Sequence, residues 1–295
     1  MPFAAVFSAA LVWGLIWYPF RVLEEAGVSG VLSTSLIYLI AMLFGAFMLP
    51  RIWNELRNAG GWIVLLMVSV GWANLGNVLA VLEGEIMRVL LLFYIAPLWT
   101  ILFSYWLLDE RLNRIGCMVM LLSFSGAMVM LWEPSLGMPL PVNLAEWISL
   151  SAGMAFALSN VVARRASHLS LELKSYSVWI GTFLMTIPLL MWQGGVTESV
   201  RSIDTYSWTL LGLLGIVIFG VSFAVQYALE ILPANRTIVL FLFELVVAAI
   251  ASYYLADEAM NLRDYMGALL IISATLLSGK LYDSSETLQS KLKIE

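Results

Sequence analysis

Apolar residues run through this chain in long blocks separated by short polar stretches. The blocks show neither the alternation of a strand nor the stripe of an amphipathic helix, and each is about 20 residues long, the length that crosses a bilayer core as a helix. The pattern predicts an all-α integral membrane protein with ten transmembrane helices, near residues 3–20, 30–49, 61–82, 87–107, 113–132, 145–163, 174–193, 207–229, 236–255 and 264–282.

Turn-forming and charged residues mark the breaks between these blocks. Residues 109–114 (DERLNR) separate the fourth block from the fifth, and 133–143 (EPSLGMPLPVN) separate the two halves. Between the third and fourth blocks we expect a tight turn at Gly84, since glycine permits a positive φ. The first block lacks a basic leading segment and a small-residue cleavage site, so we expect a retained helix rather than a signal peptide.

Two segments of the chain repeat each other without a gap. Residues 88–113 and 236–261 align at a constant offset of 148. The offset carries the fourth block onto the ninth, an odd number of steps, so the copies are expected to face opposite ways in the bilayer. We predict two inverted five-helix repeats, 1–138 and 139–282, then a polar cytoplasmic tail, 283–295; inverted repeats are typical of secondary transporters. Identical residues align at Arg88/Arg236, Leu92/Leu240, Phe93/Phe241, Ser104/Ser252, Tyr105/Tyr253, Leu107/Leu255, Asp109/Asp257, Glu110/Glu258 and Asn113/Asn261, and more faintly Gly14 aligns with Gly153.

Composition agrees with a membrane protein and narrows its partners. The chain is 61% hydrophobic and 12% charged, against about 25% charged residues in soluble domains, and its mean hydropathy is +0.91. The formal net charge of −5 gives no reason to expect nucleic acid. A single cysteine, Cys117, excludes an internal disulfide and a multi-cysteine metal site. No cofactor and no metal are predicted, and oligomeric state stays open.

The distribution of lysine and arginine predicts the orientation. With a cytoplasmic N-terminus, eleven of these residues fall on the cytoplasmic side, and four fall on the other: Arg21, Arg88, Arg201 and Arg263. The positive-inside rule therefore favours cytoplasmic N- and C-termini. We expect a bacterial inner membrane.

The two units resemble the drug/metabolite transporter superfamily, and within it the ten-helix EamA-type group of amino-acid and metabolite exporters. The resemblance is carried by Tyr94–Ile95–Ala96–Pro97–Leu98 with Asp109–Glu110, and by Ala228–Leu229–Glu230, Phe243–Glu244–Leu245 and Asp257–Glu258. It covers nearly the whole chain to about residue 282. It implies a central cavity lined by helices 1, 3, 4, 6, 8 and 9, with Tyr94 among the lining residues. Leu245 replaces a proline common in the second unit, which puts a kink there in doubt.

Glu244 is the sharpest candidate for chemistry. It lies about eight residues, or roughly 12 Å, into the ninth block at about 1.5 Å per residue. A carboxylate near mid-membrane is costly and usually faces a cavity, a partner or a proton path. Glu244 can contact a substrate ammonium or carry a coupling proton; a protonated structural glutamate is the alternative. Pro97 aligns with Leu245, and a mid-helix proline removes a backbone hydrogen bond, although it can serve packing alone.

Other polar and aromatic residues recur at helical spacing within the blocks. They can line the cavity or serve as interhelical hydrogen bonds, each worth only about 1 kcal/mol. This set consists of Trp13, Trp17, Asn74, Asn77, Asn160, Ser222 and Gln226.

Charged residues at the block ends are read as structural. Arg88 and Arg236 are expected to anchor at the membrane interface by snorkelling. Asp109–Glu110 and Asp257–Glu258 are expected to cap the helices that follow them.

The predicted function is a secondary transporter that moves a small metabolite by alternating access. With a glutamate, amides and aromatics but no mid-span arginine or lysine, an amino acid or a related amphipathic or cationic compound fits better than a phosphorylated anion, which needs cationic partners. Export is the expected direction, and protons are a candidate coupling ion. A drug, nucleotide-sugar or organic-anion carrier and a non-transporting receptor or assembly protein are alternatives. An enzyme is not expected: there is no HExxH motif and no pair of intramembrane aspartates.

Overall fold

The computed structural model describes residues 2–84, 86–132, 140–255 and 260–292, and within these ranges its secondary structure is helices joined by short turns and loops. The described residues are 87% helical, and they hold nine helices long and apolar enough to cross a membrane. The tenth predicted span lies in α15, which continues as helix to Leu292. The helices are α1 (Pro2–Leu15), α2 (Trp17–Glu25), α3 (Gly30–Phe44), η1 (Gly45–Met48), α4 (Leu49–Asn58), α5 (Gly61–Glu83), α6 (Ile86–Phe93), α7 (Ala96–Leu108), α8 (Arg114–Leu131), α9 (Leu144–Arg165), α10 (Leu171–Gln193), α11 (Val196–Ser202), α12 (Thr205–Ile231), α13 (Ala234–Phe241), α14 (Phe243–Leu255) and α15 (Leu262–Leu292).

Polar caps fix where several spans begin. The side chain of Asn113 accepts a hydrogen bond from the backbone N–H of Gly116 at 2.7 Å, and Asn143 does the same for Glu146 at 2.9 Å. Such caps satisfy N–H groups that the first helical turn leaves without a partner. The Asp109–Glu110 turn does not cap the helix that follows it, contrary to expectation, because Asn113 is the N-cap of α8. Asp109 ends α7 in a left-handed conformation, and Asp257–Glu258 lies outside the described residues.

The turn before α6 differs from the prediction. Gly84 has φ −114° and is extended, so it does not use the positive φ that glycine allows. It is needed for space, since a Cβ there would lie 2.6 Å from Val89 and 2.9 Å from Ala145.

Spans 4 and 9 are both broken, at the same place in the repeat. Span 4 is α6 followed by α7, with the break at Tyr94–Ile95, and span 9 is α13 followed by α14, with the break at Leu242. α6 and α13 have matching bounds at the offset of 148. Pro97 lies in the first turn of α7, where a missing N–H costs little. The second break forms without a proline, so the doubt raised by Leu245 was unfounded.

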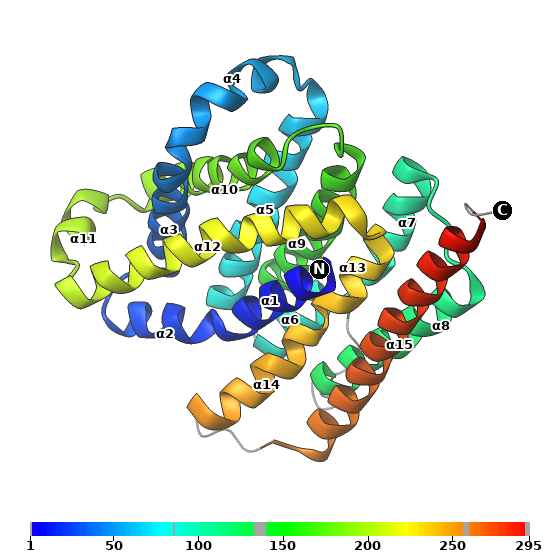
Figure 1. Cartoon of the computed structure of the whole chain (residues 1–295). Helices are drawn as coiled ribbons and strands as arrows, with labels where there is room; N and C mark the ends of the chain where they lie inside the picture. Colours follow the sequence, from blue (N-terminus) through cyan, green and yellow to red (C-terminus); the bar gives the residue numbers. More distant parts are fainter. Residues whose placement is uncertain (1, 85, 133–139, 256–259, 293–295) are drawn as a thin grey trace.

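The helices pack in pairs that recur between the halves (Figure 1). α5 packs against α9, and α12 against α1; α5 packs against α10, and α12 against α3. α8 and α15 lie side by side at one edge of the bundle (Figure 1). This pairing is the one that two repeats would produce, while their opposed orientation in the membrane stays a prediction.

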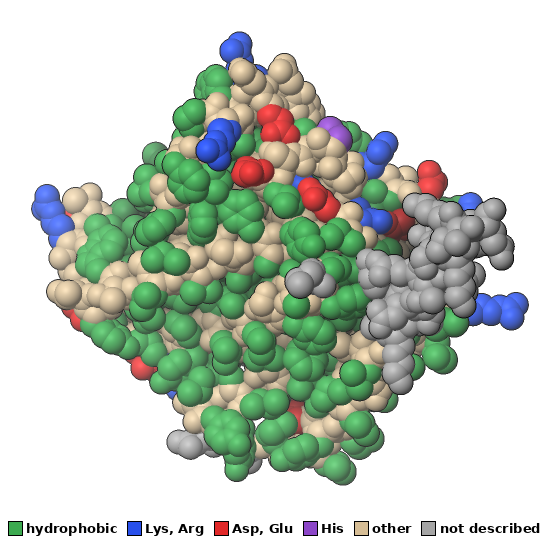
Figure 2. Space-filling view, in the orientation of Figure 1, with side chains coloured by type: hydrophobic (Ala, Val, Ile, Leu, Met, Phe, Trp, Pro, Cys, Tyr) green, Lys and Arg blue, Asp and Glu red, His purple; other side chains and the backbone are tan. Residues whose placement is uncertain are grey.

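The largest apolar core lies between α3, α5, α10 and α12. Trp179 is fully buried there, stacks on Phe219 at 5.0 Å between ring centroids, and donates to Ser222 at 2.8 Å. Gly45 leaves room for this indole, since a Cβ would lie 2.3 Å from the ring. Figure 2 shows apolar side chains over most of the visible surface, with charges gathered toward one end. An apolar exterior of this kind suits contact with lipid.

Candidate functional site

The two helix breaks bring Tyr94 and Glu244 together. The phenol of Tyr94, in the break of span 4, donates a hydrogen bond to the carboxylate of Glu244, in the first turn of α14. Both side chains are half-buried. The contact joins the two halves of the chain at the depth where each broken span loses its regular hydrogen bonds. Two of the predicted site residues are therefore in direct contact.

Aromatic rings from three spans lie beside this contact. Phe93 and Phe241 are equivalent in the repeat, and both pack against Phe156 of α9, with centroids 5.6 and 5.7 Å apart. Phe93 also meets Tyr94 edge-on at 5.5 Å. The sequence shows Phe93 and Phe241 as a matched pair, but their shared contact with Phe156 depends on packing and was not foreseen. Aromatic rings gathered next to both helix breaks offer π surface, which attracts cations.

Close glycine contacts hold the first helix of each half against the broken helix of the other. A Cβ on Gly14 of α1 would lie 2.7 Å from the carbonyl oxygen of Glu244. A Cβ on Gly153 of α9 would lie 2.3 Å from the carbonyl oxygen of Phe93. Glycine removes the side chain that would separate these backbones, as at other membrane helix interfaces. Gly14 and Gly153 thus serve the same kind of close packing, although the residues they face, Glu244 after one break and Phe93 before the other, are not equivalent in the repeat.

The remaining predicted site residues are spread over several interfaces. Asn74 donates to Thr182 of α10 at 2.9 Å, and Ser222 binds Trp179, so both lie at contacts with α10. Trp13 packs between two apolar clusters near Phe156, and Pro97 is buried in α7. Four others carry a buried polar atom without a hydrogen-bond partner in the structure: Trp17, Asn77, Asn160 and Gln226.

Asn160 and Gln226 are the most deeply buried of the predicted site residues with an unpartnered atom, at 4% and 3% exposure. Burying an amide without a hydrogen bond costs roughly 1–3 kcal/mol by protein mutational data. Such groups are usually satisfied by water or a ligand. Their membership of a substrate cavity stays a prediction.

Ion pairs at both ends of the bundle were missed by the sequence reading. Arg88 makes a bidentate pair with Glu146 at 2.7 and 3.0 Å and also donates to the Leu140 carbonyl. Its side chain is 11% exposed and that of Glu146 is 1% exposed. Arg88 is therefore held in a buried ion pair and is not a snorkelling anchor. The only signal in the sequence was a carboxylate in the first turn of the sixth block.

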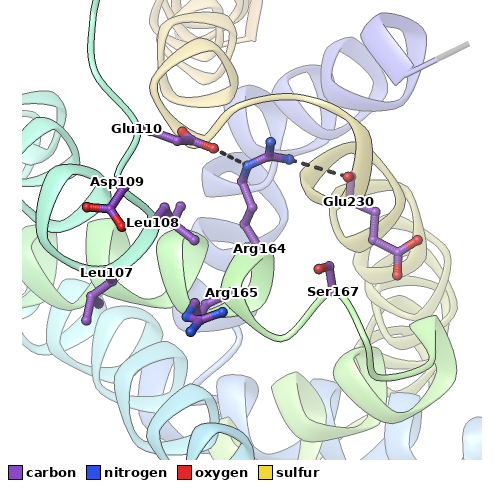
Figure 3. A pocket seen from close by; sticks show the side chains of 8 residues that line it. All are labelled: Leu107, Leu108, Asp109, Glu110, Arg164, Arg165, Ser167 and Glu230. Carbon is purple, nitrogen blue, oxygen red and sulfur yellow. Dashed lines mark hydrogen bonds and ion pairs between the residues drawn. The ribbon is translucent and has the colours of Figure 1, made fainter.

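A second group of charges lies where α7, α9 and α12 end. Arg164 pairs with Glu110, and Lys174, which is fully buried, pairs with Glu230 at 2.5 Å. A cavity of about 370 Å³ lies beside these groups. Figure 3 shows Arg164 between Glu110 and Glu230, with Arg165, Ser167 and Asp109 around it.

Broken spans that meet inside the bundle are typical of membrane transporters, and comparisons with known proteins support that class. Residues 143–279 match the EamA-like transporter family. A transporter of Pseudomonas aeruginosa described as uncharacterized is 26% identical, over 94% of this chain and 85% of that protein. An S-adenosylmethionine uptake transporter of Rickettsia prowazekii is 27% identical, over 66% of this chain and 63% of that protein.

The fold is also similar to that of a solved crystal structure, with a TM-score of 0.75 at 18% identity, covering 97% of this chain and 98% of that one. The family match, which covers the second half of the chain, and the transporter relatives together support an EamA-type protein of the drug/metabolite transporter superfamily. The protein is an integral membrane transporter.

Proposed function

We propose that this protein is a secondary transporter for a small metabolite with a cationic amino group, an amino acid or a related amphipathic compound, in the bacterial inner membrane. The observation that carries the proposal is the Glu244 carboxylate just after the break of span 9, bound by the phenol of Tyr94. A substrate ammonium can take the place of the phenol and form a charge-assisted hydrogen bond, which is about twice as strong as a neutral one.

The surroundings of the carboxylate support an amphipathic substrate. Phe93, Phe156 and Phe241 supply apolar and π surface, while the amides of Asn160 and Gln226 supply hydrogen-bonding groups within the same bundle. An amino acid with an apolar or aromatic side chain matches both. The Rickettsia relative is named for S-adenosylmethionine, a compound with an ammonium and a sulfonium, so it belongs among the test ligands.

Alternating access is the proposed mechanism, with the two halves as inverted repeats and the substrate near the membrane midplane. The matched breaks of spans 4 and 9 support it, because each gives a hinge at the depth of Glu244. Export is the proposed direction. The Rickettsia relative is named as an uptake transporter, so the transport assay in vesicles measures import as well as export.

A thermal-shift screen of the purified protein against amino acids, S-adenosylmethionine, cationic drugs and phosphorylated metabolites tests the substrate class. A ligand at 100 times its Kd adds about 2.7 kcal/mol to the stability of the folded state. We expect stabilisation by amino-group compounds that Glu244→Gln abolishes, followed by movement of the same compounds in reconstituted vesicles. Movement of an organic anion with no response to any amine would contradict the proposal.

A further inference from the structure

Glu110 connects four helix ends at the predicted cytoplasmic end of the bundle. It follows α7, pairs through its carboxylate with Arg164 in the last turn of α9, and accepts a hydrogen bond from the backbone N–H of Ala234, the first residue of α13, at 3.2 Å. Arg164 in turn donates to the carbonyls of Leu229 and Glu230 at the end of α12, at 3.1 and 3.3 Å. One carboxylate from the first half thus binds α9 and α13 directly, and α12 through Arg164.

The contacts around Glu110 also join the two broken spans, 4 and 9. α7 is the second part of span 4, and α13 is the first part of span 9. One residue beyond Ala234, Asn235 donates to Ser104 of α7 at 2.7 Å, and both side chains are buried. Spans 4 and 9 are therefore bonded at this end as well as at Tyr94–Glu244.

The opposite end of the same two spans is arranged differently. The repeat predicts α6 and α14 to be the counterparts of α13 and α7. α7 packs against α13, whereas α6 packs against α9 and α8, and α14 against α1 and α15. Within the described residues, α6 and α14 make no comparable contact with each other. The bundle is closed between spans 4 and 9 at the Glu110 end.

We infer that Glu110 and Arg164 form a latch that closes the Glu110 end of the transport path and must separate for that end to open. The latch lies between solvent and the buried amides of Asn160 and Gln226. It is defined here as Glu110, Arg164, the Ala234 N–H and the Leu229 and Glu230 carbonyls. Its two charged side chains are about one-fifth exposed, at 19% and 22%. Asn160 is one helical turn from Arg164 toward the membrane interior, about 6 Å along the axis.

The charges suit a reversible contact. Glu110 and Arg164 compensate each other when the latch is closed, and both are near enough to solvent to be hydrated when it opens. A fully buried pair would incur a large desolvation cost on closing and leave unpaired buried charges on opening. The inference builds on the proposed alternating access, and it names Glu110 and Arg164 as positioning residues that do not touch substrate.

Cysteine labelling tests the latch without any substrate. In a Cys117→Ser background, Asn160→Cys places a thiol at a site that is 4% exposed, and a membrane-impermeant thiol reagent is applied from each side in turn. Glu110→Gln removes the ion pair and keeps an acceptor for Ala234. We expect labelling from the predicted cytoplasmic side to become about tenfold faster, since losing a charged hydrogen bond shifts a two-state population by that order.

Glu25→Gln is the matched control. It breaks an Arg21–Glu25 pair of the same chemistry that lies exposed within α2, and we expect no change in labelling. If Glu110→Gln labels no faster than this control, or only loses thermal stability, the latch is wrong. If Glu110→Gln does not accumulate in the membrane, Arg164→Lys is tested in its place. Lysine keeps the positive charge but cannot contact Glu110 and both carbonyls at once. Labelling faster than in the Glu25→Gln control supports the latch, and labelling no faster contradicts it. Because the readout needs no transport, a failure of the substrate proposal leaves it intact, and the reverse also holds.

Discussion

At the residue scale, the contact of Glu244 with Tyr94 is the feature on which function depends most. We expect Glu244→Gln to reduce transport of an amine by about tenfold or more, since a hydrogen bond to a charged group is worth about 1.5–3 kcal/mol. If the carboxylate carries the coupling proton, the variant also loses the pH dependence of the remaining transport. Initial rates in proteoliposomes between about pH 5 and 8 measure both effects.

Tyr94→Phe is the companion variant, because it removes the phenol and keeps the carboxylate. A smaller loss than in Glu244→Gln, with the pH dependence retained, is expected. An unchanged pH profile in a fully active Glu244→Gln protein would remove the proton role.

Gly153 offers a prediction about packing at the break of span 4. A Cβ there would lie 2.3 Å from the backbone carbonyl of Phe93, and backbone atoms cannot move aside as a flexible side chain can. Gly153→Ala should destabilise the protein by about 1–3 kcal/mol, the usual cost of overpacking. Equilibrium unfolding in mixed micelles measures it.

Gly212→Ala provides the comparison, because a Cβ at Gly212 meets nothing within 4 Å. We expect no loss of stability and a gain of up to about 1 kcal/mol, because alanine is the better helix former. Equal effects of the two variants would show that the close approach at Gly153 is not limiting.

At the element scale, α9 is held to span 4 by an ion pair near each of its ends, Arg88–Glu146 and Glu110–Arg164. Arg88→Ala would leave Glu146, which is 1% exposed, without its bidentate partner. Removing one partner of a buried pair typically costs about 3–5 kcal/mol. We expect a loss of that size in the free energy of unfolding.

The exposed Arg21–Glu25 pair gives the scale for comparison, with side chains 56% and 67% exposed. Arg21→Ala should change stability by no more than about 1 kcal/mol, the range for surface pairs. A loss for Arg88→Ala as small as that for Arg21→Ala would mean that the buried pair contributes little.

The helices themselves follow closely from the sequence. Block length is a local signal, and it places seven of the nine spans found in the described residues within three residues of their observed ends. The first two helical stretches continue to Glu25 and Asn58, beyond the predicted ends at 20 and 49. The ion pairs could not be predicted the same way. Arg88 and Glu146 are far apart along the chain, so their pairing depends on how α6 packs on α9. From the sequence alone, each of these charges is equally consistent with an interfacial anchor or a helix cap.

The candidate site likewise combines residues that the sequence could identify with contacts that depend on packing between distant helices. Glu244 was identified because an ionisable residue is unusual inside an apolar block, and Tyr94 because it lies in a segment that resembles the EamA-type group. For Ser222 and Asn74 the sequence left cavity lining and interhelical hydrogen bonding open. In the structure they are hydrogen-bonded to Trp179 and Thr182 of α10. The break at Leu242 shows that packing can interrupt a helix without proline, so residue type alone could not foresee it.

At the scale of the whole molecule, the inverted repeat makes a direct prediction about topology. Asn113 and Asn261 are equivalent positions in the two halves, and both are exposed. In a Cys117→Ser background, Asn113→Cys and Asn261→Cys should be labelled by an impermeant reagent from opposite sides of the membrane, the first from the cytoplasm. Labelling of both from one side would show that the halves are parallel.

The two ion pairs of α9 have a consequence for how the molecule is assembled. Each pair joins a residue of the first half (1–138) to α9 of the second half (139–282). Gly153 adds a close backbone contact between the two halves. These contacts do not depend on a peptide bond between the halves. Two separately translated polypeptides, divided between residues 133 and 143, should therefore associate in the bilayer and reconstitute the transporter.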